Sequence, residues 1–93
     1  MESNFGKILI VDDEQDIVEF IDYNLRKAGY ETATAYNGDE AIRKAAVFNP
    51  DLILLDVMMP EKDGHQTIQA LRKNPDLDKT IIIFLTALSD EKS

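Results

Sequence analysis

Short apolar runs recur along the chain and are separated by longer segments of mixed polarity. Three of these runs are continuous and rich in aliphatic residues: Lys7–Val11, Leu52–Leu55 and Ile81–Leu85. Such a run is typical of a strand that is buried on both faces of a sheet. A fourth segment, Tyr30–Ala35, alternates apolar and polar residues and contains two threonines, which predicts a strand less buried than the first.

The segments between these predicted strands show helical spacing. From Glu14 to Ala28 the apolar residues recur at steps of three and four, and the inward-facing set is predicted to be Ile17, Phe20, Ile21, Leu25 and Ala28. A second helix is predicted from an apolar face made of Ala41, Ile42, Ala45 and Phe48, and it must end before Asn49-Pro50. The segment His65–Lys73 predicts a short third helix with Ile68 and Leu71 facing inward.

The alternation of strands and helices predicts the fold class. Strand, helix, strand, helix, strand, helix, strand is the order of an α/β protein with a doubly wound parallel sheet. Residues 1–93 are expected to form one domain, because a chain of this length has no room for two separate cores. In such sheets ligands bind beyond the carboxyl ends of the strands, so the residues that follow the apolar runs are the ones to inspect.

Charge and composition narrow the function classes. The chain carries 18 acidic and 10 basic residues, a formal net charge of -8, which argues against direct binding to nucleic acid or to anionic membranes. Cysteine is absent, so thiolate metal sites and disulfides are excluded. No long apolar run or signal-like segment is present, and we expect a soluble cytoplasmic domain.

Acidic and hydroxyl side chains follow three of the predicted strands. Asp12 and Asp13 come after the first run, Asp56 after Leu52–Leu55, and Thr86 after the last run. In a parallel sheet these positions meet at one edge. Neighbouring carboxylates raise one another's pKa unless a cation lies between them, and a set of oxygen ligands without His or Cys favours Mg²⁺.

Each of these residues also has a plain structural explanation. Asp12 and Asp13 would serve as N-terminal caps of the following helix, and Asp56 would make a turn before Pro60. Thr86 taken alone is more typical of a strand end or cap than of a ligand. The functional interpretation is favoured because independent caps need not all fall at the carboxyl ends of strands. His65, without a second His or Cys, is interpreted as a surface residue.

Three separated motifs resemble a known family, the response-regulator receiver domains of two-component signalling. They are Ile8–Glu14, the segment Asp51–Pro60 followed by Gly64, and Leu85–Ala87. Together they cover nearly the whole chain. The sequence around Asp56 and Thr86 most resembles members that are joined to a winged-helix DNA-binding domain and regulate transcription.

The resemblance implies a role for each residue of the predicted site. Asp56 would be the nucleophile that takes a phosphoryl group from a phosphohistidine on a sensor histidine kinase. Asp13, Asp56 and the backbone carbonyl of Met58 would bind Mg²⁺ directly, and Asp12 would hold the metal through water. Thr86 would donate a hydrogen bond to the phosphoryl group. A receiver of this kind accepts one phosphoryl group and is not an enzyme in the usual sense.

The resemblance also implies a flavodoxin-like fold with strand order 2-1-3-4, counted along the chain. Family members continue with a fifth strand, whose lysine contacts the phosphoryl group, and with a final helix; the sequence stops before both, so we expect a truncated domain. Strand Ile81–Leu85 would then have an open edge, through which we expect self-association.

Two alternatives belong to other function classes. One is a receiver-like interaction module that is not phosphorylated, which the missing lysine favours. The other is a phosphatase of the haloacid-dehalogenase type, which also uses an aspartate at a strand end with Mg²⁺. That family has a second aspartate two residues after the nucleophile, where this chain has Met58.

Overall fold

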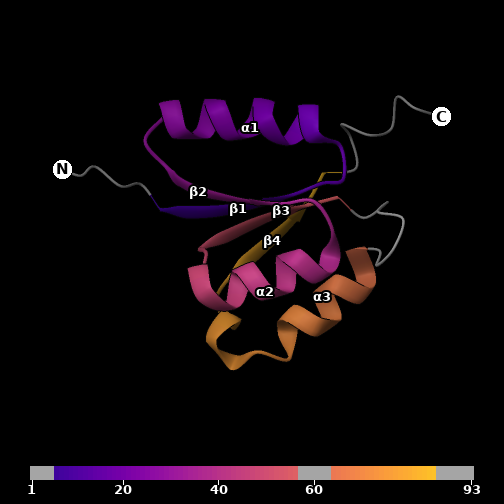
Figure 1. Cartoon of the computed structure of the whole chain (residues 1–93). Helices are drawn as coiled ribbons and strands as arrows, with labels where there is room; N and C mark the ends of the chain where they lie inside the picture. Colours follow the sequence, from indigo (N-terminus) through magenta and orange to yellow (C-terminus); the bar gives the residue numbers. More distant parts are fainter. Residues whose placement is uncertain (1–5, 57–63, 86–93) are drawn as a thin grey trace.

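A four-stranded parallel sheet forms the centre of the molecule (Figure 1). The computed structural model describes residues 6–56 and 64–85; Met58 and Thr86 lie outside these ranges. The strands are β1 (Lys7–Val11), β2 (Glu31–Ala35), β3 (Leu52–Leu55) and β4 (Ile81–Phe84). They are arranged in the order β2-β1-β3-β4, and all three neighbouring pairs are parallel. The α/β fold and the strand order predicted from the sequence are confirmed.

Helices lie on both faces of this sheet (Figure 1). The chain order places one helical segment between each strand and the next: α1 (Gln15–Lys27), α2 (Gly38–Phe48), and α3 (Gly64–Arg72) with the short 3-10 helix η1 (Pro75–Leu77). One face is covered by α1, and the other by α2 and α3. None of the helices in the described ranges is long and apolar enough to cross a bilayer.

Two hydrophobic clusters fix the sheet between these layers. The larger one lies on the side of α2 and α3 and is built around Leu9, Val11, Ile53 and Leu55, which are all fully buried. The smaller one lies under α1 and contains Ile8, Ile10 and Val18. Strand β1 therefore contributes alternate residues to both clusters, as expected for a strand buried on both faces.

The inward face of α1 differs from the predicted one. Val18 is fully buried, and Ile21 and Leu25 are packed against its cluster, whereas Phe20 is 69% exposed. Positions 18, 21 and 25 also follow three- and four-residue steps, so the periodicity admitted two overlapping faces. Packing against Ile8 and Ile10 selects the face that contains Val18, and the prediction for Phe20 was wrong.

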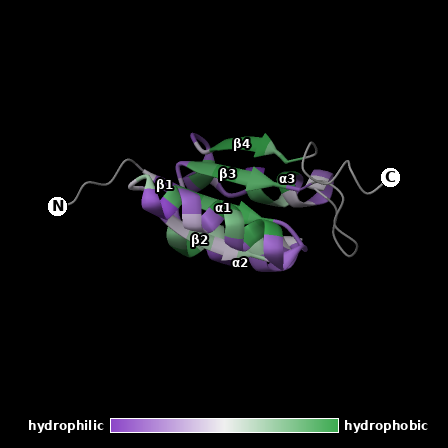
Figure 2. Cartoon of the chain, turned by 90° about the horizontal axis from the view of Figure 1, so that it is seen from above, coloured by the Kyte–Doolittle hydropathy of each residue, from purple (hydrophilic) through white to green (hydrophobic). Residues whose placement is uncertain are grey.

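The α1 side of the sheet is covered unevenly by the described elements. Seen from that side, α1 lies over β1 and β2, while the hydrophobic strands β3 and β4 lie beside it (Figure 2). Ile81 and Ile83 are 60% and 47% exposed. Strand β2, at the opposite edge, carries mainly small and polar residues and is less buried than β1, as the sequence predicted.

Candidate functional site

The register of the sheet brings two distant aspartates together. Val11 is paired with Leu55, so the residues that follow β1 and β3 are neighbours at the carboxyl edge. The backbone continues this pairing, because the Asp56 N–H donates to the carbonyl of Val11 at 2.9 Å. The Asp12 N–H donates to the carbonyl of Ala35 at 3.2 Å, which fixes Asp12 between its neighbouring strands.

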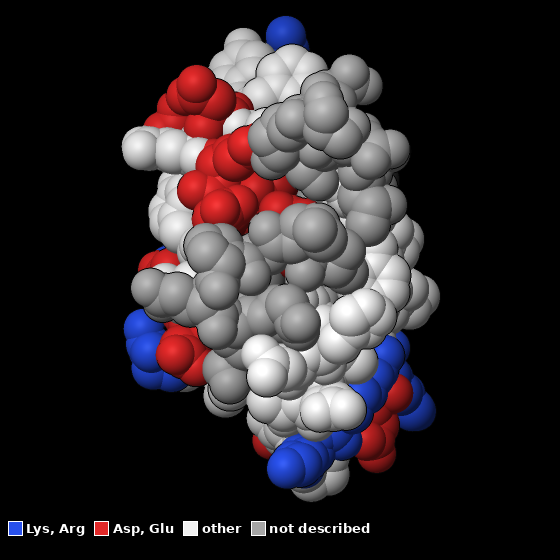
Figure 3. Space-filling view, turned by 90° about the vertical axis from the view of Figure 1, so that its right-hand side faces the viewer, with Lys and Arg blue, Asp and Glu red and all other residues white. Residues whose placement is uncertain are grey.

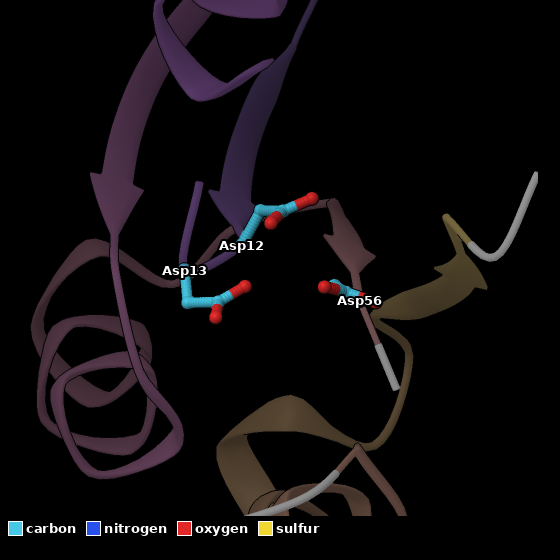
Figure 4. A group of neighbouring side chains, drawn as sticks. All are labelled: Asp12, Asp13 and Asp56. Carbon is cyan, nitrogen blue, oxygen red and sulfur yellow. The ribbon is translucent and has the colours of Figure 1, made fainter. Parts of the chain in front are cut away.

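Asp13 completes a cluster of three carboxyl groups at this edge. Oxygens of Asp12, Asp13 and Asp56 all lie within 4.8 Å of one another. The side chains of Asp13 and Asp56 point toward each other, and Asp12 lies beside them at the end of β1 (Figure 4). Asp12 and Asp56 are almost fully buried, and Asp13 is exposed. Acidic side chains gather in the upper left part of this face of the molecule (Figure 3).

Asp12 has an unusual environment for a carboxylate. Its Oδ1 accepts a hydrogen bond from the Glu14 N–H at 2.9 Å. Its Oδ2 is buried and, within the described ranges, has no hydrogen-bond partner. The pKa of Asp12 is raised to about 6, mainly by burial and in part by the negative charge of Asp56, while the Glu14 hydrogen bond opposes the rise. The ionised form of Asp12 is therefore costly when no cation is bound.

These residues fit a hard divalent cation. A buried carboxylate oxygen without a donor needs a positive partner, and a cation placed among the three carboxyl groups supplies it. All the available ligand atoms are oxygens, and one exposed member keeps the cluster open to water. Mg²⁺ accepts one or two carboxylates and retains several waters, which agrees with this set. The three carboxyl groups together could therefore hold such an ion.

The structure thus brings together three of the predicted site residues. Met58 and Thr86 fall outside the described ranges, and their roles stay predictions. The alternative in which Asp12 and Asp13 are the N-caps of the first helix does not match the structure, because the N-cap residue of α1 is Glu14. The hydrogen bond from the Glu14 backbone to Asp12 was not predicted, since it depends on the turn between β1 and α1. His65 is exposed and contacts the Phe84 ring at 6.0 Å between ring centres.

Comparisons with known proteins identify the family. The chain matches the family model of the response regulator receiver domain over residues 8–93. It is 46% identical over 85 residues to the alkaline phosphatase synthesis transcriptional regulatory protein PhoP of Bacillus subtilis, covering 91% of this chain and 35% of that protein. It is 47% identical over 90 residues to the probable transcriptional regulator ycf27 of Cyanophora paradoxa, covering 97% of this chain and 36% of that protein.

Solved structures agree with this assignment. The N-terminal domain of a response regulator receiver protein from Methanoculleus marisnigri superimposes with a TM-score of 0.84 at 35% identity, covering 89% of this chain and 68% of that one. The chemotaxis protein CheY4 of Vibrio cholerae gives a TM-score of 0.83 at 33% identity, covering 94% and 75%. The chain spans about a third of the length of the curated relatives it matches. It belongs to the family of response regulator receiver domains.

Proposed function

We propose that this chain accepts a phosphoryl group on Asp56 from a phosphohistidine of a sensor histidine kinase. The observation that carries the proposal is the position of Asp56 at the carboxyl end of β3, within 4.8 Å of the carboxyl oxygens of Asp12 and Asp13. Membership of the receiver family supports it. A carboxylate at this place is a nucleophile that requires no general base, because it carries no proton to remove.

The proposed transfer forms one bond and breaks one bond. A carboxylate oxygen of Asp56 attacks the phosphorus, and the phosphorus–nitrogen bond of the phosphohistidine breaks. The product is an acyl phosphate on Asp56, and the electron pair returns to the imidazole of the kinase. Phosphoryl transfer depends mainly on positioning and on charge neutralisation, so the rigid ends of β1 and β3 are suited to hold the reacting group.

Asp12 and Asp13 hold the metal in this proposal. When bound, Mg²⁺ would neutralise the negative charge of the cluster and of the incoming phosphoryl oxygens. Asp13, Asp56 and the Met58 carbonyl would be its direct ligands, and Asp12 would bind it through water. Thr86 would donate a hydrogen bond to the phosphoryl group. The roles of Met58 and Thr86 rest on the family resemblance alone.

The full-length protein is proposed to regulate transcription in the cytoplasm. Two relatives are named as transcriptional regulators, and this chain matches about a third of each. The acidic receiver would carry the signal, and direct contact with DNA would belong to another part of the protein. The receiver itself would take up one phosphoryl group per molecule and would not turn over a substrate as an enzyme does.

Phosphotransfer to the purified chain tests the proposal. We would incubate it with acetyl phosphate, or with a phosphorylated histidine kinase, in Mg²⁺ buffer and measure the intact mass. One phosphoryl group is expected on the parent and on the control Asp76→Asn, which changes an exposed carboxylate. No label is expected on Asp56→Asn or without Mg²⁺. Peptide mapping should place the label on Asp56, and hydroxylamine should remove it, as it does an acyl phosphate.

Other results would contradict this function. A label on Ser, Thr or His65 that survives alkaline treatment would show a different acceptor. Continuous release of phosphate from a small phosphate ester would favour a haloacid-dehalogenase-type phosphatase. A chain that stays unlabelled by several kinases and donors, while still binding Mg²⁺, would favour an interaction module.

A further inference from the structure

A groove between the edge strand β2 and helix α2 lies apart from the acidic cluster. It is open to solvent and has a volume of about 690 Å³. Its lining combines basic side chains with apolar ones: Lys7, Arg43 and Lys44, with Ala33, Val47 and Phe48. Lys7 is the first residue of β1, whereas Asp12 and Asp13 follow its last residue. This part of the groove therefore lies at the amino ends of the strands, and the proposed site of phosphotransfer lies at their carboxyl ends.

The charge of this groove opposes that of the whole chain. Only ten basic residues balance 18 acidic ones in the sequence, yet three of the ten line this groove. Lys7 Nζ donates to the carbonyl of Phe48 at 3.2 Å and lies 5.3 Å from the centre of its ring. Neither partner is a carboxylate. Among the described residues no salt bridge within 4 Å involves Lys7 or Arg43. The charge of Arg43 acts on the Glu40 carboxylate, but no short contact holds its exposed guanidinium there, so it can turn toward a ligand.

Lys44 plays a different part in the same groove. Its Nζ donates to the carbonyl of Thr34 at 2.6 Å and lies 3.3 Å from a carboxylate oxygen of Glu40. One carbonyl of the edge strand β2 is thereby occupied, and much of the charge of Lys44 is neutralised. A ligand is therefore expected to lie in the groove against α2 rather than to extend the sheet along β2.

The apolar part of the groove is open to a partner. Val47 is 85% exposed, more than any other large apolar side chain in the described ranges. It follows Arg43 by four residues on α2, so the two side chains are neighbours on one face of the helix. Half-buried Phe48 continues this surface. A single exposed valine is ordinary. An exposed valine beside an exposed guanidinium in an open groove favours a ligand that is both apolar and anionic.

We propose that this groove binds an acidic peptide segment of a partner protein. An aliphatic or aromatic side chain of the peptide packs on Val47 and Phe48, and its carboxylates pair with Arg43 and Lys7. Nucleic acid is disfavoured, because three cations on a chain of net charge -8 do not form a track for a phosphate backbone. The proposal does not depend on phosphotransfer to Asp56, because neither the lining nor the charge of the groove includes the acidic cluster.

An NMR titration tests the proposal with a defined probe. The probe is a short peptide with capped ends, in which leucine and phenylalanine are flanked by aspartates and glutamates. We expect amide shift changes confined to β2, α2 and the start of β1, and a dissociation constant that rises with salt concentration. A second peptide, with the acidic residues replaced by their amides, is expected to bind at least about tenfold more weakly.

Matched variants assign the binding to the groove. Arg43→Glu and Val47→Ser should each weaken the acidic peptide by about tenfold or more, because one reverses a charge and the other removes the apolar contact. The controls Lys73→Glu and Phe20→Ser make the same kinds of change at exposed positions elsewhere, and should alter the dissociation constant less than about twofold. All four positions are exposed, so the variants should keep the fold, which their amide spectra will show.

Three results would overturn the proposal. One is the absence of shifts along α2 and β2 at millimolar peptide. Another is equal weakening by Arg43→Glu and by Lys73→Glu, which would reduce the effect to net charge. The third is a set of groove shifts that follows the protein concentration without peptide, which would assign the groove to a second copy of the chain. Failure of phosphotransfer to Asp56 would leave all of these outcomes unchanged.

Discussion

Replacing Asp12 by Asn should stabilise the metal-free protein at neutral and higher pH. The carboxyl group of Asp12 is fully buried, and its Oδ2 has no hydrogen-bond partner in the described ranges. Asn keeps the size of the side chain and an oxygen to accept the Glu14 N–H. Its amide nitrogen replaces the oxygen that lacks a donor and removes one negative charge beside Asp56. The substitution therefore removes an unfavourable feature without opening a cavity.

The magnitude follows from the pKa of Asp12. This pKa is raised from 3.8 to about 6, with burial as the largest cause. At about 1.36 kcal/mol per pH unit, the difference corresponds to about 3 kcal/mol of destabilisation when Asp12 is ionised in the folded protein. Local relaxation and entry of water reduce this figure, so we expect a gain of about 1–3 kcal/mol for Asp12→Asn. In a domain of this size, each kcal/mol shifts the melting temperature by about 4–8 °C.

Ionisation of Asp12 should make the parent protein less stable as the pH rises. Below pH 3.8 Asp12 is protonated in both the folded and the unfolded protein, and the penalty is absent. As the pH rises toward 6 the folded protein binds more protons than the unfolded one, so the free energy of unfolding of the parent falls. Above pH 6 the loss is complete. Glu40 has the opposite tendency, because its pKa is lowered by the Tyr36 N–H, but it is present in both proteins and cancels in the comparison.

Urea unfolding of parent and variant between pH 4 and pH 8, in buffer with a chelator, measures the difference. Asp12→Asn should exceed the parent by little at pH 4 and by the full amount at pH 8. The control Asp76→Asn changes an exposed carboxylate and should show no such trend. A variant that is less stable than the parent at pH 8, or a gain that does not change with pH, would refute the electrostatic reasoning.

Four further predictions follow from particular contacts. Mg²⁺ at ten times its dissociation constant should stabilise the parent by about 1.4 kcal/mol in thermal melts, and Asp13→Asn should lose most of this gain. Asn37→Ala should cost about 1 kcal/mol in urea unfolding, because the Asn37 side chain accepts the Glu40 N–H at 2.8 Å while Glu40 accepts the N–H of Tyr36. Arg72→Ala should cost about 1–3 kcal/mol, since its guanidinium donates to two backbone carbonyls at 2.9 Å after α3; an equal cost for Arg72→Lys would argue against this bidentate role. The chain should self-associate at micromolar concentration through exposed β4, and Ile83→Lys should shift sedimentation toward monomer; unchanged sedimentation would exclude that surface.

The fold could be predicted because its strongest signals are independent of atomic detail. Ile8–Val11 is apolar at consecutive positions, a pattern typical of a strand buried on both faces, which β1 confirms. Helix α1 shows what hydrophobic periodicity alone does not predict. Its sequence offers two overlapping apolar faces, and the choice between Val18 and Phe20 is made by contact with Ile8 and Ile10 of the sheet, which periodicity does not contain.

The candidate site could be located for a similar reason. Residues after parallel strands meet at one edge, so Asp12, Asp13 and Asp56 were expected to converge, and the structure brings them within 4.8 Å. The differences in burial and hydrogen bonding among these three aspartates could not be predicted. Asp12 is buried with one oxygen facing no donor in the described ranges, whereas Asp13 is exposed. That difference arises from the turn at Glu14, whose N–H satisfies only one oxygen of Asp12.

The basic groove between β2 and α2 could not be predicted from the sequence. Nothing in the sequence connects its residues Lys7, Arg43 and Val47. Lys7 and Arg43 are 36 positions apart along the chain. The composition even points the other way, because a net charge of -8 suggests that anionic ligands are repelled. Only the packing of α2 against the sheet brings these three side chains to one open groove. We therefore expect the net charge to disfavour partners that cover much of the surface, such as nucleic acid, but not a short acidic segment that contacts only this groove.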